Sequence, residues 1–358
     1  MLHYLQSWFN RHFSDPQVVI LALVLLIGLA IALFAGRLLA PLIASVILAY
    51  LLEGAVRFMV RHGARRPIAV VLVFSLFLTL FIVTMLLLIP LLAGQVGQLA
   101  RELPAIAARL QDLALHLPER YPQIFSDQQV YELLASIRNN VTAFGQRVVV
   151  LSLTSAVHFI TFLVYLVLVP LLVFFMLKDK ARIVAWFLGF LPRERSLVNH
   201  VWADVEAGIG SYVRGKFIEI LIVWSVSYVV FALLGLPYAM LLSFIVGLSV
   251  IVPYVGAAVA TVPVAVVAYF EFGLAPHFWY VLGAYGVIQF LDGNVLVPLL
   301  FSEVVNLHPV AIIAAVLIFG GIWGLWGVFF AIPLATLIAA VLRAWPSPPE
   351  PGQGTLEA

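Results

Sequence analysis

Three polar side chains lie within a stretch that is otherwise apolar enough to cross a bilayer. Gln289, Asp292 and Asn294 interrupt the apolar run 278–301, and Pro298 closes the interruption. A carboxylate near the bilayer centre costs at least about 2.5–3.5 kcal/mol on insertion scales, so we expect Asp292 to face a wet or protein-lined interior. The amides and the carboxylate offer donors, acceptors and one charge, which suit a hydroxyl-rich solute, a cation or a proton. The segment predicts part of a solute path, and a helix cap among the lipid headgroups is the alternative.

A second candidate for the solute path lies in the middle of the apolar stretch 236–270. As one helix this stretch would measure ~52 Å, well beyond the bilayer core. Pro253 removes a backbone donor and Gly256 permits a turn, with Tyr254 between them. We therefore expect two half-helices that meet at mid-membrane and line a cavity. The alternative is a long helix that is merely kinked.

Charged residues stand at the start of the apolar run 208–235, namely Arg214, Lys216 and Glu219. Lys216 and Glu219 are three positions apart, so they share one helix face and can form an ion pair. Together with Arg214 they are candidates for a gate or for ion coupling. Snorkelling of the two basic side chains towards the headgroups is the alternative.

The composition excludes several classes of function. Hydrophobic residues make up 64% of the 358 positions and charged residues 10%, against about 25% charged in soluble domains. Lys plus Arg number 19 and Asp plus Glu 17, so no basic face for nucleic acid is expected. The chain has no cysteine, no nucleotide-binding glycine loop and no hydrolase motif, and its eight histidines lack metal-ligand spacing. We expect neither an enzyme nor a cofactor or metal site.

The polar residues must be positioned by membrane helices. A span takes about 20 residues, and candidate runs fall at 18–36, 38–56, 68–93, 148–177, 208–235, 236–270, 278–301 and 308–342. The fold class predicted is an all-α integral membrane protein with about eight transmembrane segments, or six plus two re-entrant hairpins. The clusters of Lys and Arg at 57–66 and 178–195, with Arg11 and Arg343, place both termini in the cytoplasm. The loop Glu271–His277 lacks Lys and Arg, which favours the version with hairpins.

A polar stretch at 93–147 carries apolar residues spaced by three and four, as in packed helices. It predicts an extracytoplasmic helical hairpin, which is either a solvated arm or an assembly surface between subunits. The chain accordingly divides into N-terminal transmembrane helices (1–92), this amphipathic hairpin (93–147), a transmembrane helix with a cytoplasmic interfacial segment (148–207), a C-terminal bundle with broken helices (208–343) and a disordered tail (344–358).

Six ordered motifs resemble the autoinducer-2 exporter family, the PerM-like group of bacterial membrane transporters, and the likeness spans most of the chain. These motifs are Tyr50–Glu53, Val169–Asp179, Tyr212–Gly215, Val252–Gly256, Gln289–Pro298 and Leu307–Pro309. Two positions depart from the family pattern: Lys216 stands where Gln is usual, and Glu303 lies where a basic residue is common.

The resemblance implies a multi-pass transporter of the bacterial inner membrane that acts as a homo-oligomer, with a pentamer as one candidate assembly. Some members are linked to export of a small furanone-type signal and others to sodium/proton antiport. We therefore expect the lipid bilayer and a small polar solute or cation as partners. The expected function is export of a solute such as a quorum-sensing signal, either passive or coupled to an ion. A cation/proton antiporter is the alternative within transport, and a membrane scaffold acting through 93–147 is the alternative outside it.

Overall fold

The computed structural model describes residues 40–115, 155–190, 196–253, 255–301 and 308–344, with Leu23, Gln128, Ala135 and Ser136. Apart from these four residues, the predicted span 18–36 and the second half of the 93–147 hairpin lie outside the described residues, as does the tail after Ala344. Helices are the regular secondary structure found in the described ranges, and no strand occurs there. The protein is an all-helical membrane protein, as its composition predicts.

The N-terminal part of the chain packs around α3. Its elements are α3 (Ala40–Arg61), α4 (Arg66–Val83), the π-helical turn η1 (Thr84–Leu88), α5 (Ile89–Leu115), α8 (Ser155–Lys178) and α9 (Lys180–Gly189). Val56 on α3, Val70 on α4 and Val173 on α8 are buried in one apolar cluster. The hydroxyl of Ser45 on α3 donates to the carbonyls of Pro41 and, at 3.4 Å, Val169, which adds a polar contact between α3 and α8.

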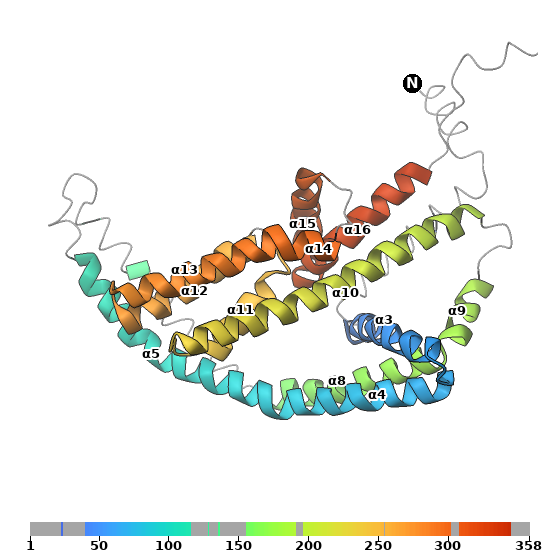
Figure 1. Cartoon of the computed structure of the whole chain (residues 1–358), viewed down its shortest axis with the longest axis horizontal. Coiled ribbons are helices and arrows are strands. Elements are labelled where there is room, and N and C mark those ends of the chain that lie inside the picture. The colour runs from blue at the N-terminus through green and yellow to red at the C-terminus, as the bar shows by residue number, and fades with distance from the viewer. Residues whose placement is uncertain are drawn as a thin grey trace, which may run out of the picture.

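The chain forms one long arc from α4 through η1 into α5, as Figure 1 shows. The predicted span 68–93 and the first helix of the 93–147 hairpin are therefore one continuous helix. The π-turn precedes Pro90, whose ring would clash with the carbonyl of Leu86 in a regular helix, and a wider turn relieves that clash.

The arc of α5 contacts the C-terminal part of the chain near the start of α11. The Gln95 side chain accepts a hydrogen bond from the backbone N–H of Leu241 at 2.8 Å. Partial burial, together with the Glu102 carboxylate, raises the pKa of Tyr238 to about 12, so its hydroxyl stays protonated and can donate to Glu102. The first helix of the predicted arm thus holds α11 in place rather than standing apart from the bundle.

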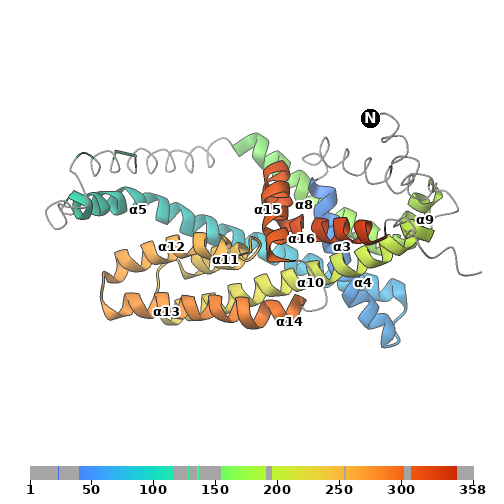
Figure 2. The same cartoon turned by 90° about the horizontal axis from the view of Figure 1, so that it is seen from above.

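The C-terminal part consists of α10 (Ser196–Leu233), α11 (Ala239–Ser249), α12 (Val255–Phe272), α13 (Pro276–Leu291), η2 (Asp292–Leu296), α14 (Val297–Phe301), α15 (Pro309–Trp323) and α16 (Leu325–Ala344). Helices α10 to α13 lie side by side in Figures 1 and 2 and bury a common core that includes Phe231, Leu242, Val264 and Val281. Helix α16 packs along α10.

The stretch 236–270 is broken where the sequence predicts it. Helix α11 has 11 residues, or ~16 Å, which is about half the bilayer core. A non-helical connection follows at Pro253 before α12 starts. A side chain at Gly256 would overlap the carbonyl of Ser249, so the return of α12 against the end of α11 requires glycine. The merely kinked helix is ruled out.

The segment Gln289–Pro298 is helical throughout, so its polar residues interrupt the apolar run 278–301 without breaking the backbone, contrary to the broken helices expected for 208–343. Helix α13 continues through η2 into α14, and the N–H of Val297 bonds to the carbonyl of Asp292 five residues back. As at Pro90, the widened turn precedes a proline, Pro298, and the same steric reason applies.

The stretch 308–342 contains a break that was not predicted. Helices α15 and α16 form a close antiparallel pair joined at Gly324, whose φ is +60°. A side chain at Gly327 would overlap the carbonyl of Phe319, so small residues let the two backbones meet. Glycine at both positions was the available signal.

Five described helices are long and apolar enough to cross a bilayer, and they comprise Pro41–Arg61, Arg66–Ile106, Gly208–Leu233, Val255–Phe272 and Pro276–Phe301. Four shorter apolar helices accompany them: Leu163–Lys178, Ala239–Ser249, Val310–Trp323 and Trp326–Leu342. The total of eight spans stays a prediction.

Candidate functional site

A cavity of about 470 Å³ lies where α10, the α11–α12 connection, η2 and the α15–α16 pair meet. Its polar lining comprises Tyr212, Lys216, Glu219, Gln289 and Asp292. The apolar remainder includes Pro253, Pro298, Phe301, Ile312 and Ile332. The two segments singled out from the sequence, around Pro253 and around Asp292, therefore contribute to one cavity.

Lys216 is held by three neighbours from three elements. Its Nζ lies 2.6 Å from Oε2 of Glu219, and the two side chains are only 5% and 2% exposed. The same ammonium donates to the carbonyl of Val250 at 2.9 Å and lies 5.1 Å from the centre of the Phe301 ring. Lys216 does not snorkel. It joins α10 to the backbone break after α11.

Other polar atoms around the cavity are buried without a hydrogen-bond partner among the described residues. They are the Tyr212 hydroxyl, the Nε2 of Gln289 and the Oδ1 of Asp292. Leaving a buried donor or acceptor unsatisfied costs about 1–3 kcal/mol, so native proteins keep few of them. Several such groups in one cavity offer hydrogen bonds to water or to a solute.

The widened turn η2 positions the polar residues of the α13–α14 helix. Asp292 begins the turn and, with Gln289 one turn earlier, lines the cavity. Asn294 is exposed and donates to the carbonyl of Phe290 in its own helix at 2.9 Å. The predicted set of three polar residues is thus divided, and Asn294 does not line the cavity.

Helix α12 is fixed to α13 beside the cavity by a polar contact. The Tyr285 hydroxyl donates to the carbonyl of Ala257 at 2.7 Å, and Thr261 Oγ1 donates to the same carbonyl at 2.8 Å. Ala257 lines the cavity one residue after Gly256. The start of α12 is held where the chain returns from its break.

The remaining predicted residues lie elsewhere. Arg214 points away from the cavity: its guanidinium stacks over the Tyr50 ring at 5.5 Å and donates to Ser211 at 3.3 Å. Gly256 shapes the connection without lining the cavity, and Tyr254 lies outside the described residues. Tyr212 and Phe301 were missed as lining residues. Tyr212 could have been found, because it stands one helical turn before Lys216 on the same face.

The family model for AI-2E family transporters matches residues 20–347 of this chain. The chain belongs to the AI-2E transporter family. The resemblance seen in the six motifs is confirmed, and a transporter family rather than an enzyme family accounts for nearly the whole length.

Several relatives of this AI-2E family member cover it almost from end to end. "Putative permease PerM" of Escherichia coli K12 is 44% identical over 346 residues, which is 97% of this chain and 98% of the relative. "Putative transport protein YueF" of Bacillus subtilis is 24% identical and covers 92% of both chains. The "AI-2 transport protein TqsA" of E. coli K12 is 22% identical over 91% of this chain and 92% of the relative.

Proposed function

We propose that this AI-2E family member exports a small polar solute, such as a quorum-sensing signal, across the bacterial inner membrane, passively or with ion coupling. The solute would pass through the cavity between α10, the α11–α12 connection and η2. The observation that carries the proposal is the group of unpartnered polar atoms on Tyr212, Gln289 and Asp292. Membership of a family with permease and AI-2 transport relatives supports it.

Substituted-cysteine labelling tests whether the cavity is a water-filled path. The chain has no cysteine of its own, so single variants report cleanly. We expect Ala257→Cys, which lines the cavity, to react with a charged, membrane-impermeant thiol reagent. Val259→Cys, two positions along α12 and 63% exposed on the outer surface, should stay unreactive in the bilayer. A silent Ala257→Cys with normal folding would contradict the proposal.

Cation/proton antiport is the second candidate, and the charges of the cavity favour it. One ammonium, that of Lys216, faces two carboxylates, those of Glu219 and Asp292, around the same space. With Glu219 paired to Lys216, Asp292 is left to bind a sodium ion or a proton. This arrangement would let the two ions compete for one carboxylate.

Reconstituted vesicles separate the two candidates. An antiporter changes the signal of a trapped pH dye when sodium is added, and Asp292→Asn should abolish that change. An exporter without ion coupling shows no dye response to sodium, either in the parent or in the Asp292→Asn variant. Arg214→Gln is the control, because Arg214 lies on α10 outside the cavity and should leave the dye response intact.

The scaffold alternative needs a narrower deletion than the whole of 93–147, because Gln95 holds the start of α11. Replacing 116–147 by a short linker leaves the described part of α5 in place. A transporter should keep its flux after this change. A scaffold acting through the hairpin should show no flux in the parent or in the deletion variant, and the deletion should abolish its cellular phenotype.

Assembly as a homo-oligomer, with a pentamer as the specific candidate, completes the proposal. Native mass spectrometry of the purified chain tests it, and a monomer under conditions that preserve flux would contradict it.

A further inference from the structure

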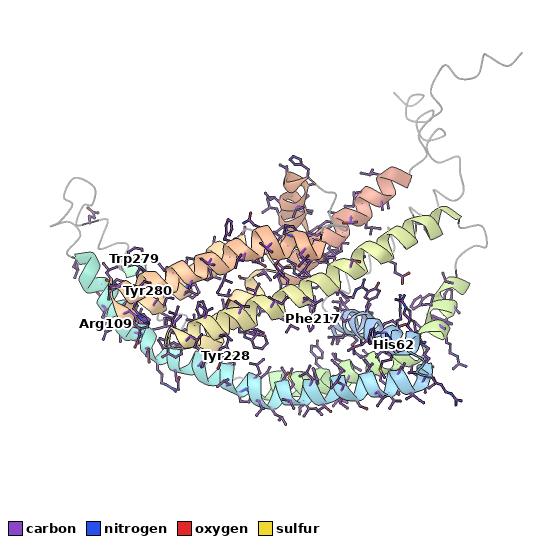
Figure 3. All side chains as sticks on the ribbon, in the orientation of Figure 1. His62, Arg109, Phe217, Tyr228, Trp279 and Tyr280 are labelled. Carbon is purple, nitrogen blue, oxygen red and sulfur yellow. The ribbon has the colours of Figure 1, made fainter. Side chains whose placement is uncertain are left out.

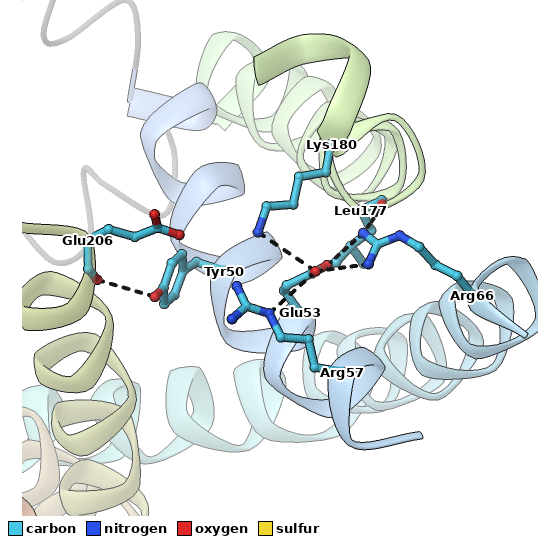
Figure 4. A network of polar contacts seen from close by, with 7 residues as sticks. All are labelled: Tyr50, Glu53, Arg57, Arg66, Leu177, Lys180 and Glu206. Atoms are coloured by element: carbon cyan, nitrogen blue, oxygen red, sulfur yellow. Dashed lines mark hydrogen bonds and ion pairs between the residues drawn. The ribbon is translucent and has the colours of Figure 1, made fainter. Parts of the chain in front are cut away.

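A second polar cluster lies outside the cavity, where α3, α4, α8 and α9 meet. Figure 4 shows three basic side chains converging on the buried carboxylate of Glu53. Arg66 donates from both of its terminal nitrogens to Glu53 at 3.1 Å, while Arg57 and Lys180 lie 3.6 and 3.7 Å from it. Arg66 also donates to the carbonyl of Leu177, where α8 ends.

One carboxylate does not balance three cations. The side chain of Glu53 is 6% exposed, whereas those of Arg57, Arg66 and Lys180 are 50%, 43% and 36% exposed. The surrounding segments 53–66 and 178–182 hold seven Lys or Arg and two acidic residues. The cluster therefore has a surplus of positive charge, and the partly exposed basic side chains present N–H donors on the protein surface.

An apolar groove of about 290 Å³ leads away from this cluster. Its walls are one face of α3 and the junction of α8 with α9, and its lining includes Leu42, Val46, Ala49, Met176, Val184 and Phe187. Glu53 and Lys180 close one end. From Leu42 to Glu53 the groove follows α3 for ~16 Å. A charged end and a long apolar body are the two halves of a lipid.

Helix α9 carries the features of a helix that lies at the membrane surface. Trp186, Phe187 and Phe190 are 60%, 61% and 71% exposed, and α9 starts at the basic junction with α8. Aromatic side chains prefer the level of the headgroups, and basic residues beside them attract anionic lipids. The polar end of the groove is thus at headgroup depth.

We propose that this site binds an anionic phospholipid, with its phosphate on Lys180, Arg57 and Arg66 and one acyl chain in the groove between α3 and α8–α9. Guanidinium and ammonium groups bind phosphate oxygens by charge-assisted hydrogen bonds. Arg66 already donates from both terminal nitrogens to Glu53, whereas Arg57 approaches Glu53 through its Nε, so Arg57 and Lys180 supply the donors and Arg66 adds charge. The site is separate from the transport cavity and does not depend on which solute is carried. Binding there would tie α3 to α9.

The test uses the purified full chain, stripped of lipid in detergent, and native mass spectrometry with added phosphatidylglycerol or phosphatidylcholine. We expect phosphatidylglycerol to bind more tightly than phosphatidylcholine. Lys180→Gln should weaken the binding of phosphatidylglycerol about fivefold, because one basic residue near an anionic surface contributes about that factor in affinity. The matched control is Arg61→Gln, which removes one charge at the end of α3 outside the contacts to Glu53 and should change binding by less than twofold. Equal losses in the two variants, or equal binding of the two lipids, would overturn the proposal.

The apolar half of the site has its own tests. Glycerol phosphate, which lacks acyl chains, should compete poorly with phosphatidylglycerol, and competition at equal concentration would show a phosphate site without a lipid. A fluorophore on Val184→Cys should be quenched by phosphatidylglycerol with brominated chains. Absent quenching would mean that residues 1–39 or a second copy of the chain covers the groove, and it would overturn the proposal.

Discussion

At the scale of single residues, Lys216 links two of the elements that form the cavity. Its ammonium contacts a carboxylate on α10 and a carbonyl at the end of α11. A buried ion pair adds little net stability, but removing one partner leaves the other charge buried and unpaired. Lys216 thus makes the geometry of the α11–α12 break depend on the charge state of the cavity.

Replacing Lys216 by Met should lower the free energy of unfolding by about 3–5 kcal/mol, because Glu219 loses its counter-charge. Chemical unfolding in detergent, followed by helix content, measures this loss. The double variant Lys216→Met, Glu219→Leu should recover most of it. Arg214→Met is the control and should cost about 1 kcal/mol or less, since that side chain is partly exposed. Equal losses at positions 214 and 216 would contradict the role given to Lys216.

At the scale of elements, two devices shape the cavity: the widened turn before Pro298 and the glycine at the start of α12. A π-turn adds one residue to the helix, and each residue rotates the following side chains by ~100° about the helix axis. The turn therefore decides which of the polar residues of 289–298 face the cavity and which face outward.

Pro298→Ala should weaken transport while leaving the fold intact, because an N–H at 298 can restore the regular bond to Asn294 and rotate the residues of η2. Flux in vesicles, together with thiol labelling of Gly293→Cys in the same background, measures the change. Pro90→Ala is the matched control, since Pro90 follows the corresponding turn η1 outside the cavity. Loss of flux in both variants alike would point to general damage rather than to the cavity.

Gly256→Ala should destabilise the protein by about 1–3 kcal/mol, because the new methyl group overlaps the carbonyl of Ser249 and forces the backbones apart. Thermal unfolding in detergent measures the effect. In the control Gly286→Ala the added atom meets nothing within 4 Å, and a helix-interior alanine should stabilise by about 0.5–1 kcal/mol. The prediction fails if both substitutions shift stability in the same direction.

At the scale of the whole molecule, α11 and α12 enter the bundle and return to the same end. His277, at the start of α13, makes a 2.9 Å hydrogen bond with the carbonyl of Leu234, just after α10. The two connections before α11 and after α12 are therefore neighbours, as Figure 2 shows. Exposed Trp279 and Tyr280 mark this end in Figure 3, and the aromatic helix α9 lies at the opposite end. Aromatic belts of this kind flank a bilayer.

This geometry predicts that Glu271→Cys is labelled from the side opposite to the basic clusters. Membrane-impermeant maleimide added to intact cells should modify Glu271→Cys. Arg182→Cys on α9, at the other end of the molecule, is the control and should react only in inverted vesicles. Labelling of Glu271→Cys from the cytoplasmic side alone would mean that α11 and α12 together cross the membrane once.

The sequence alone determined the class of protein and the region of the site. Few charges and runs of about 20 apolar residues permit only membrane helices, and a proline with a glycine in a stretch too long for one span located the break at Pro253. The spacing of Lys216 and Glu219 permitted an ion pair, because residues three apart share a helix face, but it left snorkelling open.

The tertiary structure decided which of these residues share a cavity. Helix periodicity gives the face of a side chain but not the neighbour of that face, so the contact of Lys216 with the Val250 carbonyl and the stacking of Arg214 on Tyr50 could not be read from spacing. Nor could the sequence show that Pro298 widens its helix instead of breaking it, which is why Asp292 lines the cavity and Asn294 does not. These contacts and orientations depend on packing between segments that are distant in the sequence, and local sequence patterns do not specify that packing.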